Sequence, residues 1–257
     1  LVSKILIRIF ISKKIKSSLG GKIKVLISGG AALSPKIGFF FNKIGFHLLQ
    51  GYGQTEAAPL ISCNTKKDND PSTVGFPIKN VIVKISDENE IIVKGENVMN
   101  KYWNNKKLTN ETIKNDWLHT GDLGYFDNLG RLVINGRKKE IIVTSGGDNI
   151  SVQKIESILS EQIEINQAII YGDGKPFIVA LLSIEENFNK THIINLIKRI
   201  NQKLNSVEKI RKFYLFEKPL SYDDGFLTQT QKVKRNKVHS HFKNKIEELY
   251  KSNNKNF

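Results

Sequence analysis

The pattern of hydrophobic and polar residues predicts alternating helices and strands at the start of the chain. Isoleucines and leucines recur among lysines ahead of the glycine pair 20–21, which predicts a basic helix ending at those glycines. The apolar runs 23–28 and 47–50 each predict a buried strand that leads into a glycine-rich loop. Between them, segment 35–44 begins with proline, which is typical of the first position of a helix. This arrangement predicts an α/β fold that binds its ligand at the carboxyl ends of the strands.

The middle of the chain changes to pairs of strands with alternating apolar residues. Segments 81–86 and 90–95 alternate about the turn 87–89, which predicts a β-hairpin. Segments 123–126 and 131–134 form a second pair of the same kind. We therefore expect a β-rich subdomain within the α/β domain.

Beyond Asn135 the pattern indicates a separate, small α+β domain. Strands and helices alternate there in short, well-separated runs, with strands over 141–144, 168–172 and 177–184 and helices over 152–159, 191–204 and 237–250. A polar joint, 136–139, precedes them. We expect two domains, residues 1–136 and residues 137–257.

The chain carries a net charge of +15, from 40 Lys and Arg against 25 Asp and Glu. The positive charges are scattered and no nucleic-acid-binding motif accompanies them, so we expect no nucleic-acid partner. Residues 1–24 hold a denser basic group without an acid: Lys4, Arg8, Lys13, Lys14, Lys16, Lys22 and Lys24. Two interpretations remain open, a packed helix with a solvated basic face and an amphipathic helix that contacts a membrane surface.

The single cysteine, Cys63, excludes an internal disulfide and a multi-cysteine metal site. With no signal peptide visible, the expected location is the cytoplasm, with membrane association left open by the basic helix. The chain begins with Leu1 and its one methionine is Met99, so we expect it to be an N-terminally incomplete part of a longer protein.

Segment 51–56 is the first candidate for binding chemistry. Gly51 and Gly53 allow the backbone to approach a ligand, and Tyr52 between them offers a flat apolar face. Thr55 supplies a hydroxyl for a phosphate oxygen, and Glu56 supplies a hard oxygen ligand for a divalent cation. The segment therefore predicts a nucleotide site, although a tight turn would also use two glycines at this spacing.

Five segments then occur in an order that matches a known family. They read SGGAALS, QGYGQTE, HTGDLGYFDNLGRLVINGRKKE, SGGDNISVQKIE and LTQTQKVKR. In these motifs the chain resembles the AMP-forming acyl-CoA synthetases of the adenylate-forming superfamily. The run VKGENVMNKYW and the ending LTQTQKVKR are most similar to the long-chain fatty acid-CoA ligase branch. The resemblance implies that residues 1–136 are the C-terminal part of a large AMP-binding domain and residues 137–257 a small mobile domain.

The resemblance also implies roles for residues in the first domain. These residues would bind the nucleotide: Gly29, Gly30, Ala31, Tyr52, Gly53, Thr55, Asp122 and Arg137. Within that group Asp122 would accept hydrogen bonds from the ribose hydroxyls, and Glu56 would bind Mg²⁺ next to Thr55. Taken singly, Asp122 would equally suit an Asx-turn and Arg137 a solvated linker position.

In the second domain the resemblance implies a hinge, a tunnel and a catalytic lysine. Lys139 would be the pivot, Gly146 and Gly147 would line the tunnel for coenzyme A, and Lys232 would stabilise adenylate formation together with Thr55 and Glu56. Gly147 would also suit an ordinary turn. The register of Lys232 is open as well, because Lys234 and Arg235 lie close by.

The implied reaction joins a fatty acid to coenzyme A with ATP, releasing AMP and pyrophosphate. Alternatives are another adenylate-forming ligase, such as an aryl-CoA ligase or a carrier-protein adenylation enzyme, and a non-catalytic basic surface-binding module. The family's Ser/Thr/Gly-rich phosphate loop does not precede residue 29, so we expect the chain by itself to be inactive. We expect Tyr102, Trp103 and Trp117 to be core aromatics and leave His119 unassigned.

Overall fold

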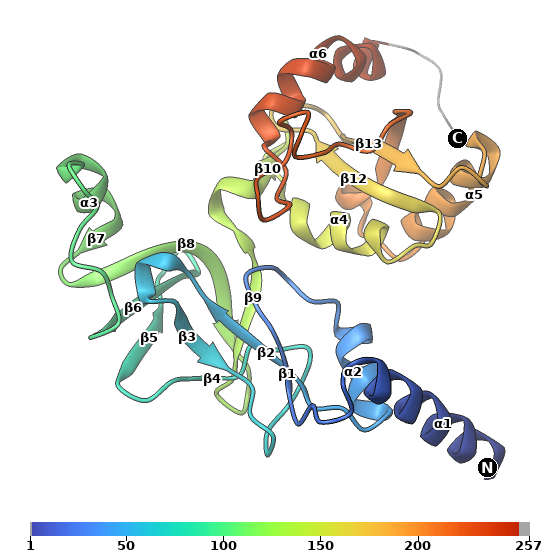
Figure 1. Ribbon diagram of the computed structural model, residues 1–257. Coiled ribbons are helices and arrows are strands. Elements are labelled where there is room, and N and C mark those ends of the chain that lie inside the picture. The colour runs from blue at the N-terminus through green and yellow to red at the C-terminus, as the bar shows by residue number, and fades with distance from the viewer. Residues whose placement is uncertain (1, 252–257) are drawn as a thin grey trace. The chain divides into compact units, whose positions relative to one another are not determined.

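The computed structural model describes residues 2–251, with side chains described from Phe10 onward. The chain divides into two compact units, Leu1–Lys138 and Lys139–Phe257, which are treated separately below. Figure 1 shows mixed helices and strands in each, so the predicted α/β class is confirmed. The domain division expected after Gly136 stays a prediction.

The first unit begins with a helix and a four-stranded sheet. Helix α1 (Val2–Ser18) ends before Gly20 and Gly21, both of which have positive φ. The sheet has the order β1-β2-β3-β4, and its members are β1 (Leu26–Ser28), β2 (Leu48–Gly53), β3 (Leu60–Cys63) and β4 (Phe76–Pro77). Strands β1 and β2 are parallel and are connected by α2 (Pro35–Lys43), as the sequence predicts.

Strand β2 is longer than expected, because Gly51, Tyr52 and Gly53 belong to the strand rather than to a loop. They pair with β3, a strand that the sequence analysis did not predict. A Cβ atom on Gly53 would lie 1.7 Å from the carbonyl oxygen of Pro59, so glycine is required for this approach of the two backbones. The 3-10 turn Thr55–Ala57 follows directly.

A second sheet completes the first unit, with the order β5-β6-β8-β7 and β9 paired to β8. Its members are β5 (Val81–Ile85), β6 (Glu90–Gly95), β7 (Ile113–Lys114), β8 (Trp117–Phe126) and β9 (Leu132–Arg137), with α3 (Lys106–Thr112) ahead of β7. One buried cluster joins Ile91, Leu118 and Leu132 of this sheet to Tyr52 and Ile61 of the first. Both predicted strand pairs are confirmed.

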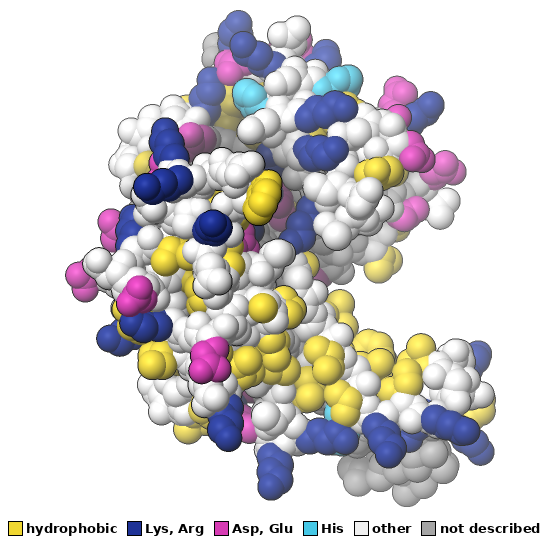
Figure 2. Space-filling view, turned by 60° about the vertical axis from the view of Figure 1, so that its left-hand side comes forward, with side chains coloured by type: hydrophobic (Ala, Val, Ile, Leu, Met, Phe, Trp, Pro, Cys, Tyr) yellow, Lys and Arg dark blue, Asp and Glu magenta, His cyan; other side chains and the backbone are white. Residues whose placement is uncertain are grey.

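The basic helix α1 and the surface charges bear on the expected contact with a membrane. Within α1 the side chain of Phe10 is 71 % exposed, whereas the side chains of Lys4 and Arg8 lie outside the described residues. No helix in residues 2–251 is long and apolar enough to span a bilayer. Figure 2 shows Lys and Arg side chains spread over the visible face among apolar and acidic ones, rather than gathered in a single patch.

The second unit is a three-stranded sheet with helices on both faces. The strands are β12 (Ile165–Tyr171), β13 (Ile178–Ile184) and β14 (Ile210–Leu215), and the helices are α4 (Val152–Ser160), α5 (Lys190–Asn201) and α6 (Arg235–Lys251). Two short strands, β10 (Ile141–Val143) and β11 (Asn149–Ser151), form a hairpin ahead of α4. Two further 3-10 turns lie at Lys138–Glu140 and Ser206–Glu208.

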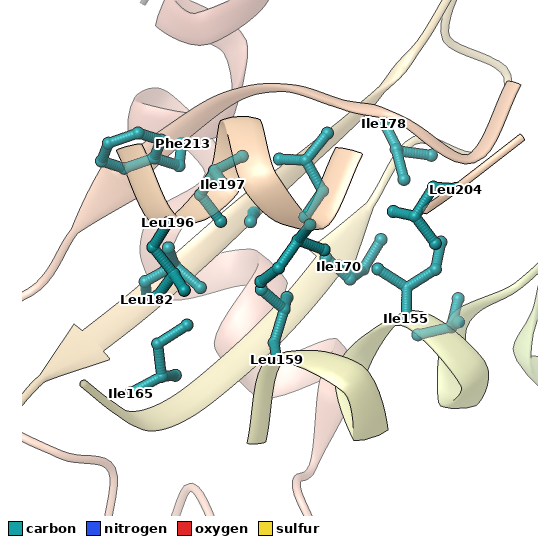
Figure 3. Packing of buried hydrophobic residues seen from close by; sticks show 14 of the residues in the cluster. Ile155, Leu159, Ile165, Ile170, Ile178, Leu182, Leu196, Ile197, Leu204 and Phe213 are labelled. Atoms are coloured by element: carbon teal, nitrogen blue, oxygen red, sulfur yellow. The ribbon is translucent and has the colours of Figure 1, made fainter. Parts of the chain in front are cut away.

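Alternation along the central strand β13 divides the core of the second unit in two. Ile178 and Leu182 face α4 and α5, where Figure 3 shows them among Ile155, Leu159 and other aliphatic side chains. Val179 and Leu181 belong to the cluster on the opposite face, which contains residues of α6. Because β13 is buried on both faces, its sequence is a short run of apolar residues rather than an alternating pattern.

Candidate functional site

Three strands of the first unit bring Tyr52, Asp122 and Arg137 together, and we call these residues the Asp122 cluster. The Tyr52 hydroxyl donates a hydrogen bond to Oδ2 of Asp122 at 2.7 Å. The Arg137 Nε lies 3.2 Å from Oδ1 of the same carboxylate. Asp122 and Arg137 are directly opposite each other in the β8–β9 ladder. The carboxylate thus bonds across the sheet, and Arg137 is the last residue of β9, with its side chain 44 % exposed.

The electrostatics of this cluster keep the Tyr52 hydroxyl protonated. Burial raises the pKa of Tyr52 well above its usual range, and the negative charge of Asp122 raises the pKa further. Arg137 opposes this shift with its positive charge. Tyr52 is therefore a hydrogen-bond donor at any pH near neutrality, and Asp122 remains the acceptor between a phenol and a guanidinium.

A bulge in β8 gives Asp122 its orientation. The pairing of β6 with β8 shifts between Glu90 and Ile92, so residues 120–122 stand out of the regular ladder. Gly121 adopts φ +72°, a conformation that favours glycine. The Thr120 hydroxyl accepts the Asp122 N–H at 3.1 Å and donates to the Ile91 carbonyl at 2.7 Å. The Thr-Gly-Asp segment is therefore held by bonds to the neighbouring strand.

The turn that carries Thr55 and Glu56 is braced by a segment 40 residues further along the chain. The Tyr102 hydroxyl donates to Oε1 of Glu56 at 2.7 Å, and the Met99 N–H donates to the Glu56 carbonyl at 2.8 Å. The side-chain amide of Asn97 donates to the Ala57 carbonyl at 2.9 Å, over a sequence separation of 40. Thr55 itself is exposed beside Glu56. Tyr102 is thus a site residue that the sequence analysis took for a core aromatic.

Burial raises the pKa of Tyr102, and its bond to the Glu56 carboxylate raises the pKa further. The signal that could have identified Tyr102 was its place in VKGENVMNKYW, one of the segments that carry the family resemblance.

The neighbouring Trp103 is 85 % exposed, so the prediction that it is a core residue was wrong. Trp117 packs under the ammonium of Lys84, whose Nζ lies 4.8 Å from the ring centroid.

The oxygen atoms available at Glu56 fit a cation site that is completed by a bound ligand. The described residues contain no group of three or more His, Cys, Asp or Glu side chains that could hold a metal ion by themselves. Glu56 uses Oε1 for Tyr102, and no donor among the described residues bonds to Oε2. Mg²⁺ is commonly held by one or two carboxylates together with substrate phosphates. Glu56 therefore fits a cation that arrives with a phosphate ligand.

The loop after β1 lies beside the strand that carries Tyr52. Gly29, Gly30 and Ala31 are exposed, and Gly30 adopts φ +81°. A Cβ atom on Gly29 would lie 3.3 Å from the Gly51 carbonyl oxygen, which shows how closely the loop approaches β2. The parallel pairing of β1 with β2 places both carboxyl ends on the same edge of the sheet. The structure therefore brings the two glycine-rich segments together.

The remaining predicted residues belong to the second unit or its first turn. Lys139 is exposed within the 3-10 turn Lys138–Glu140. Gly146 and Gly147 are exposed in the turn of the β10–β11 hairpin, where Gly147 has φ +85° and donates its N–H to the Thr144 carbonyl at 2.9 Å. These glycines form a well-defined turn, which agrees with either interpretation of Gly147.

Lys232 sits on a closed turn ahead of α6. The Thr228 N–H donates to the Lys232 carbonyl at 2.8 Å, and the Lys232 N–H donates to the Thr228 hydroxyl at 3.0 Å. Gln231 has φ +62°, and Leu227 bridges to Val233. The backbone of Lys232 is thus fixed, while its side chain is exposed.

Arg235, the nearby alternative to Lys232, has a structural partner. Its Nη2 lies 2.5 Å from Oε2 of Glu156, and Oε1 of Glu156 accepts the Ile170 N–H at 2.8 Å. Burial raises the pKa of Glu156, and the Arg235 charge partly offsets this increase. Arg235 therefore anchors the start of α6, which leaves Lys232 and Lys234 as the exposed lysines of this segment.

Comparison with known proteins gives matches along most of the chain. Residues 1–103 match the AMP-binding enzyme family, and residues 139–254 match the AMP-binding enzyme C-terminal domain. The chain is 35 % identical over 262 residues to the long-chain-fatty-acid–CoA ligase FadD15 of Mycobacterium bovis, covering 93 % of the chain and 44 % of that ligase. It is 31 % identical to the long-chain-fatty-acid–CoA ligase 5 of Rattus norvegicus, covering 93 % of the chain and 41 % of the relative.

Solved structures share the fold at lower identity. The adenylation and carrier didomain of a carboxylic acid reductase from Segniliparus rugosus, solved in complex with AMP, superposes with a TM-score of 0.79 at 21 % identity. That match covers 94 % of the chain and 36 % of the reductase chain. The chain thus spans less than half the length of these relatives, and it shares the fold of the part of the reductase that it matches.

Proposed function

Because the chain belongs to the AMP-binding enzyme family, we propose that the protein containing it is a long-chain fatty acid-CoA ligase. In the first half-reaction a carboxylate oxygen attacks the α-phosphorus of ATP, forming an acyl-adenylate and releasing pyrophosphate. In the second, the thiol of coenzyme A attacks the acyl carbon, expelling AMP and releasing a proton. The identity to long-chain ligases supports this chemistry, and the Asp122 cluster is the structural observation that carries it.

The Asp122 cluster has the groups that a nucleoside requires. A carboxylate that accepts hydrogen bonds only is suited to the two ribose hydroxyls, which are donors. The aromatic face of Tyr52 and the exposed loop of Gly29, Gly30 and Ala31 would flank the adenine base. Arg137, whose Nε lies beside the Asp122 carboxylate, would also reach the nucleotide, and Gly53 would contact it through the backbone of β2.

The phosphates would be bound by the turn that follows β2. The Thr55 hydroxyl would contact the α-phosphate, and Glu56 would hold Mg²⁺ through the oxygen that Tyr102 leaves available. The bound cation would neutralise negative charge on the phosphate oxygens. Lys232 would add a positive charge where the attack on phosphorus develops negative charge.

The second half-reaction has a different nucleophile, the thiol of coenzyme A, and needs a different surface of the active site than the one that carries Lys232. In our proposal residues 137–257 form a mobile domain that pivots at Lys139 and presents Gly146 and Gly147 to the pantetheine arm of coenzyme A. Glycines suit this position because they let a narrow chain pass close to the backbone. Peripheral membrane contact through the basic segment of α1 stays a prediction.

Product analysis tests the proposed function. The protein containing this chain is supplied with ATP, Mg²⁺, coenzyme A and either a long-chain fatty acid or an aromatic acid, and acyl-CoA and AMP are measured. We expect acyl-CoA from the fatty acid, with AMP released in equal amount. Acyl-CoA formed from the aromatic acid alone would identify an aryl-CoA ligase. Salt-sensitive binding to anionic vesicles without AMP binding would indicate a non-catalytic surface module.

A further inference from the structure

Glu90 is a buried carboxylate that the nucleotide chemistry above does not use. It begins β6, and only 7 % of its surface is exposed. A buried charge requires partners, since an unpaired one would be strongly unfavourable. Oε1 accepts the Gly121 N–H at 2.9 Å, while Oε2 lies 3.1 Å from Nδ1 of His119 and 4.0 Å from Nζ of Lys138.

These partners place Glu90 directly behind the bulge that carries Asp122. Glu90 is paired with Leu123 in the β6–β8 ladder, and the next pair is Ile92 with His119. Residues 120–122 of β8 therefore lie opposite a single residue of β6, Ile91, and the β6–β8 ladder cannot give all three of them regular partners. The Gly121 N–H, at the centre of the bulge, is satisfied by the Glu90 side chain.

The neighbouring bonds show that the bulge is held from both ends. Thr120 is bonded to the Ile91 carbonyl, and the Gly124 N–H donates to the Asn89 carbonyl at 3.0 Å. Between these contacts, one from a hydroxyl and one from a backbone N–H, the Gly121 N–H is bonded to a charged side chain, that of Glu90. A charge-assisted hydrogen bond is stronger than a neutral one, so it holds the Thr120–Gly121 peptide firmly, one peptide ahead of the one that leads into Asp122.

We infer that Glu90 is a positioning residue, whose carboxylate sets the orientation of Asp122 for the ribose hydroxyls by holding the Gly121 peptide. The inference rests on the proposed function, because the ligand of Asp122 is taken to be a nucleotide. Glu90 reaches the ligand through Gly121 and does not contact it. Its effect belongs to nucleotide binding and to the ATP-dependent half-reaction rather than to recognition of the acyl chain.

The test compares three substitutions of Glu90 with a matched control. Glu90→Leu removes the acceptor, Glu90→Asp keeps the charge but shortens the reach, and Glu90→Gln keeps an acceptor oxygen at the same distance. Glu88→Gln is the control, because the exposed Glu88 also pairs with Lys138 but does not touch Gly121. AMP affinity is measured by calorimetry, KM for ATP and for fatty acid by kinetics, and exchange of the Gly121 amide hydrogen by NMR.

We expect Glu90→Leu and Glu90→Asp to weaken AMP binding and raise KM for ATP about tenfold, which corresponds to about 1.4 kcal/mol. KM for the fatty acid should change less than twofold, and exchange of the Gly121 amide should accelerate. Glu90→Gln, which keeps a neutral acceptor at the same reach, should lose less AMP affinity and less protection of the Gly121 amide than Glu90→Asp, and Glu88→Gln should behave as wild type. Should Glu90→Leu fail to fold, Glu90→Asp makes the same comparison.

Wild-type AMP affinity in Glu90→Asp, or equal losses in Glu90→Gln and Glu90→Asp, would overturn the inference. The exchange measurement separates this failure from failure of the proposed function. If the wild-type protein binds no AMP while the Gly121 amide still responds to Glu90, the ligand is wrong and the structural link is right. If the amide does not respond, the link itself is wrong.

Discussion

Asp122 in the first unit and Lys232 in the second are held in opposite ways. The Asp122 side chain is 14 % exposed and bonded to partners on two other strands. Lys232 has an exposed side chain on a turn whose backbone is closed by two hydrogen bonds. A side chain fixed in advance loses little entropy when a ligand binds, whereas a lysine with a fixed backbone keeps a mobile ammonium. Under the proposed function, the difference would give a preorganised anchor for binding and an adaptable charge for chemistry.

The largest expected effect is the loss of adenylate formation in Lys232→Ala. Removing one group that stabilises developing charge typically lowers a rate about 10²- to 10³-fold, or about 3–4 kcal/mol. Acyl transfer from supplied acyl-adenylate to coenzyme A should change little. Pyrophosphate release and acyl-CoA formation are measured separately, with Lys234→Ala as the control. If the Lys232 variant formed acyl-adenylate normally and the Lys234 variant did not, the register of the lysine would be wrong.

Asp122→Ala should have the next largest effect, on nucleotide affinity. It removes the proposed ribose acceptor and leaves Tyr52 and Arg137 without their shared partner. Loss of hydrogen bonds to a charged group should cost about 1.5–3 kcal/mol, which is roughly 10- to 150-fold in the Kd for AMP. Calorimetry measures the change, with Glu111→Ala, an exposed carboxylate on α3, as control. An unchanged Kd would show that Asp122 is structural only.

Tyr52→Phe tests whether the Tyr52 hydroxyl helps to hold the Asp122 side chain in place. It keeps the aromatic face but removes the hydroxyl that donates to Asp122. We expect a loss of about 1 kcal/mol in unfolding free energy, measured by urea denaturation, and a similar loss in AMP affinity. Tyr125→Phe, on the exposed side of β8, is the matched control. If both variants lost equal stability, preorganisation by the Tyr52 hydroxyl would be refuted.

The smallest expected effect is a change in how the free energy of unfolding depends on pH, and it comes from Glu156, the partner of Arg235. Burial raises the pKa of Glu156 in the folded state, with Arg235 opposing the shift. A raised folded pKa means that the folded state binds the proton more tightly than the unfolded state. The resulting stabilisation is present below the ordinary carboxyl pKa and is lost as pH rises through the raised value.

Glu156→Gln removes this titration. The stability of the variant relative to wild type should therefore improve as pH rises across the weakly acidic range. Urea denaturation at several pH values measures the difference. A constant difference at all pH values would show that Glu156 has an ordinary pKa in the folded protein.

Elements with strong periodicity were predictable from the sequence, and weakly patterned ones were not. Helix α4 and strand β13 follow clear apolar patterns and lie within one residue of the expected bounds, while β12 begins three residues earlier than expected. Strand β14 was missed because it includes Arg211 and Lys212, yet Lys212 is buried and donates to the Leu249 carbonyl at 2.7 Å. A buried lysine interrupts the apolar pattern that predicts a strand, and the carbonyl group that it bonds to is known only from the folded structure.

The same limit explains which site residues the sequence could supply. Motifs identified Tyr52 and Asp122 as candidates, but the bond between them spans 70 positions. Tyr102 reaches Glu56 over 46 positions and Glu90 reaches Gly121 over 31, and neither Tyr102 nor Glu90 was predicted as a site residue. Residues whose role is to hold another residue have no local pattern of their own, so the fold was needed to find them.

The close approach at Gly53 has a consequence for mutational tolerance. In the sequence Gly51 and Gly53 look equivalent, but a Cβ at position 53 would meet the Pro59 backbone at 1.7 Å, whereas one at position 51 would meet the end of the Leu60 side chain at 3.2 Å. A side chain can rotate away and a backbone carbonyl cannot. A library selected for folding alone, with no demand on catalysis, should therefore accept alanine at position 51 and reject it at position 53.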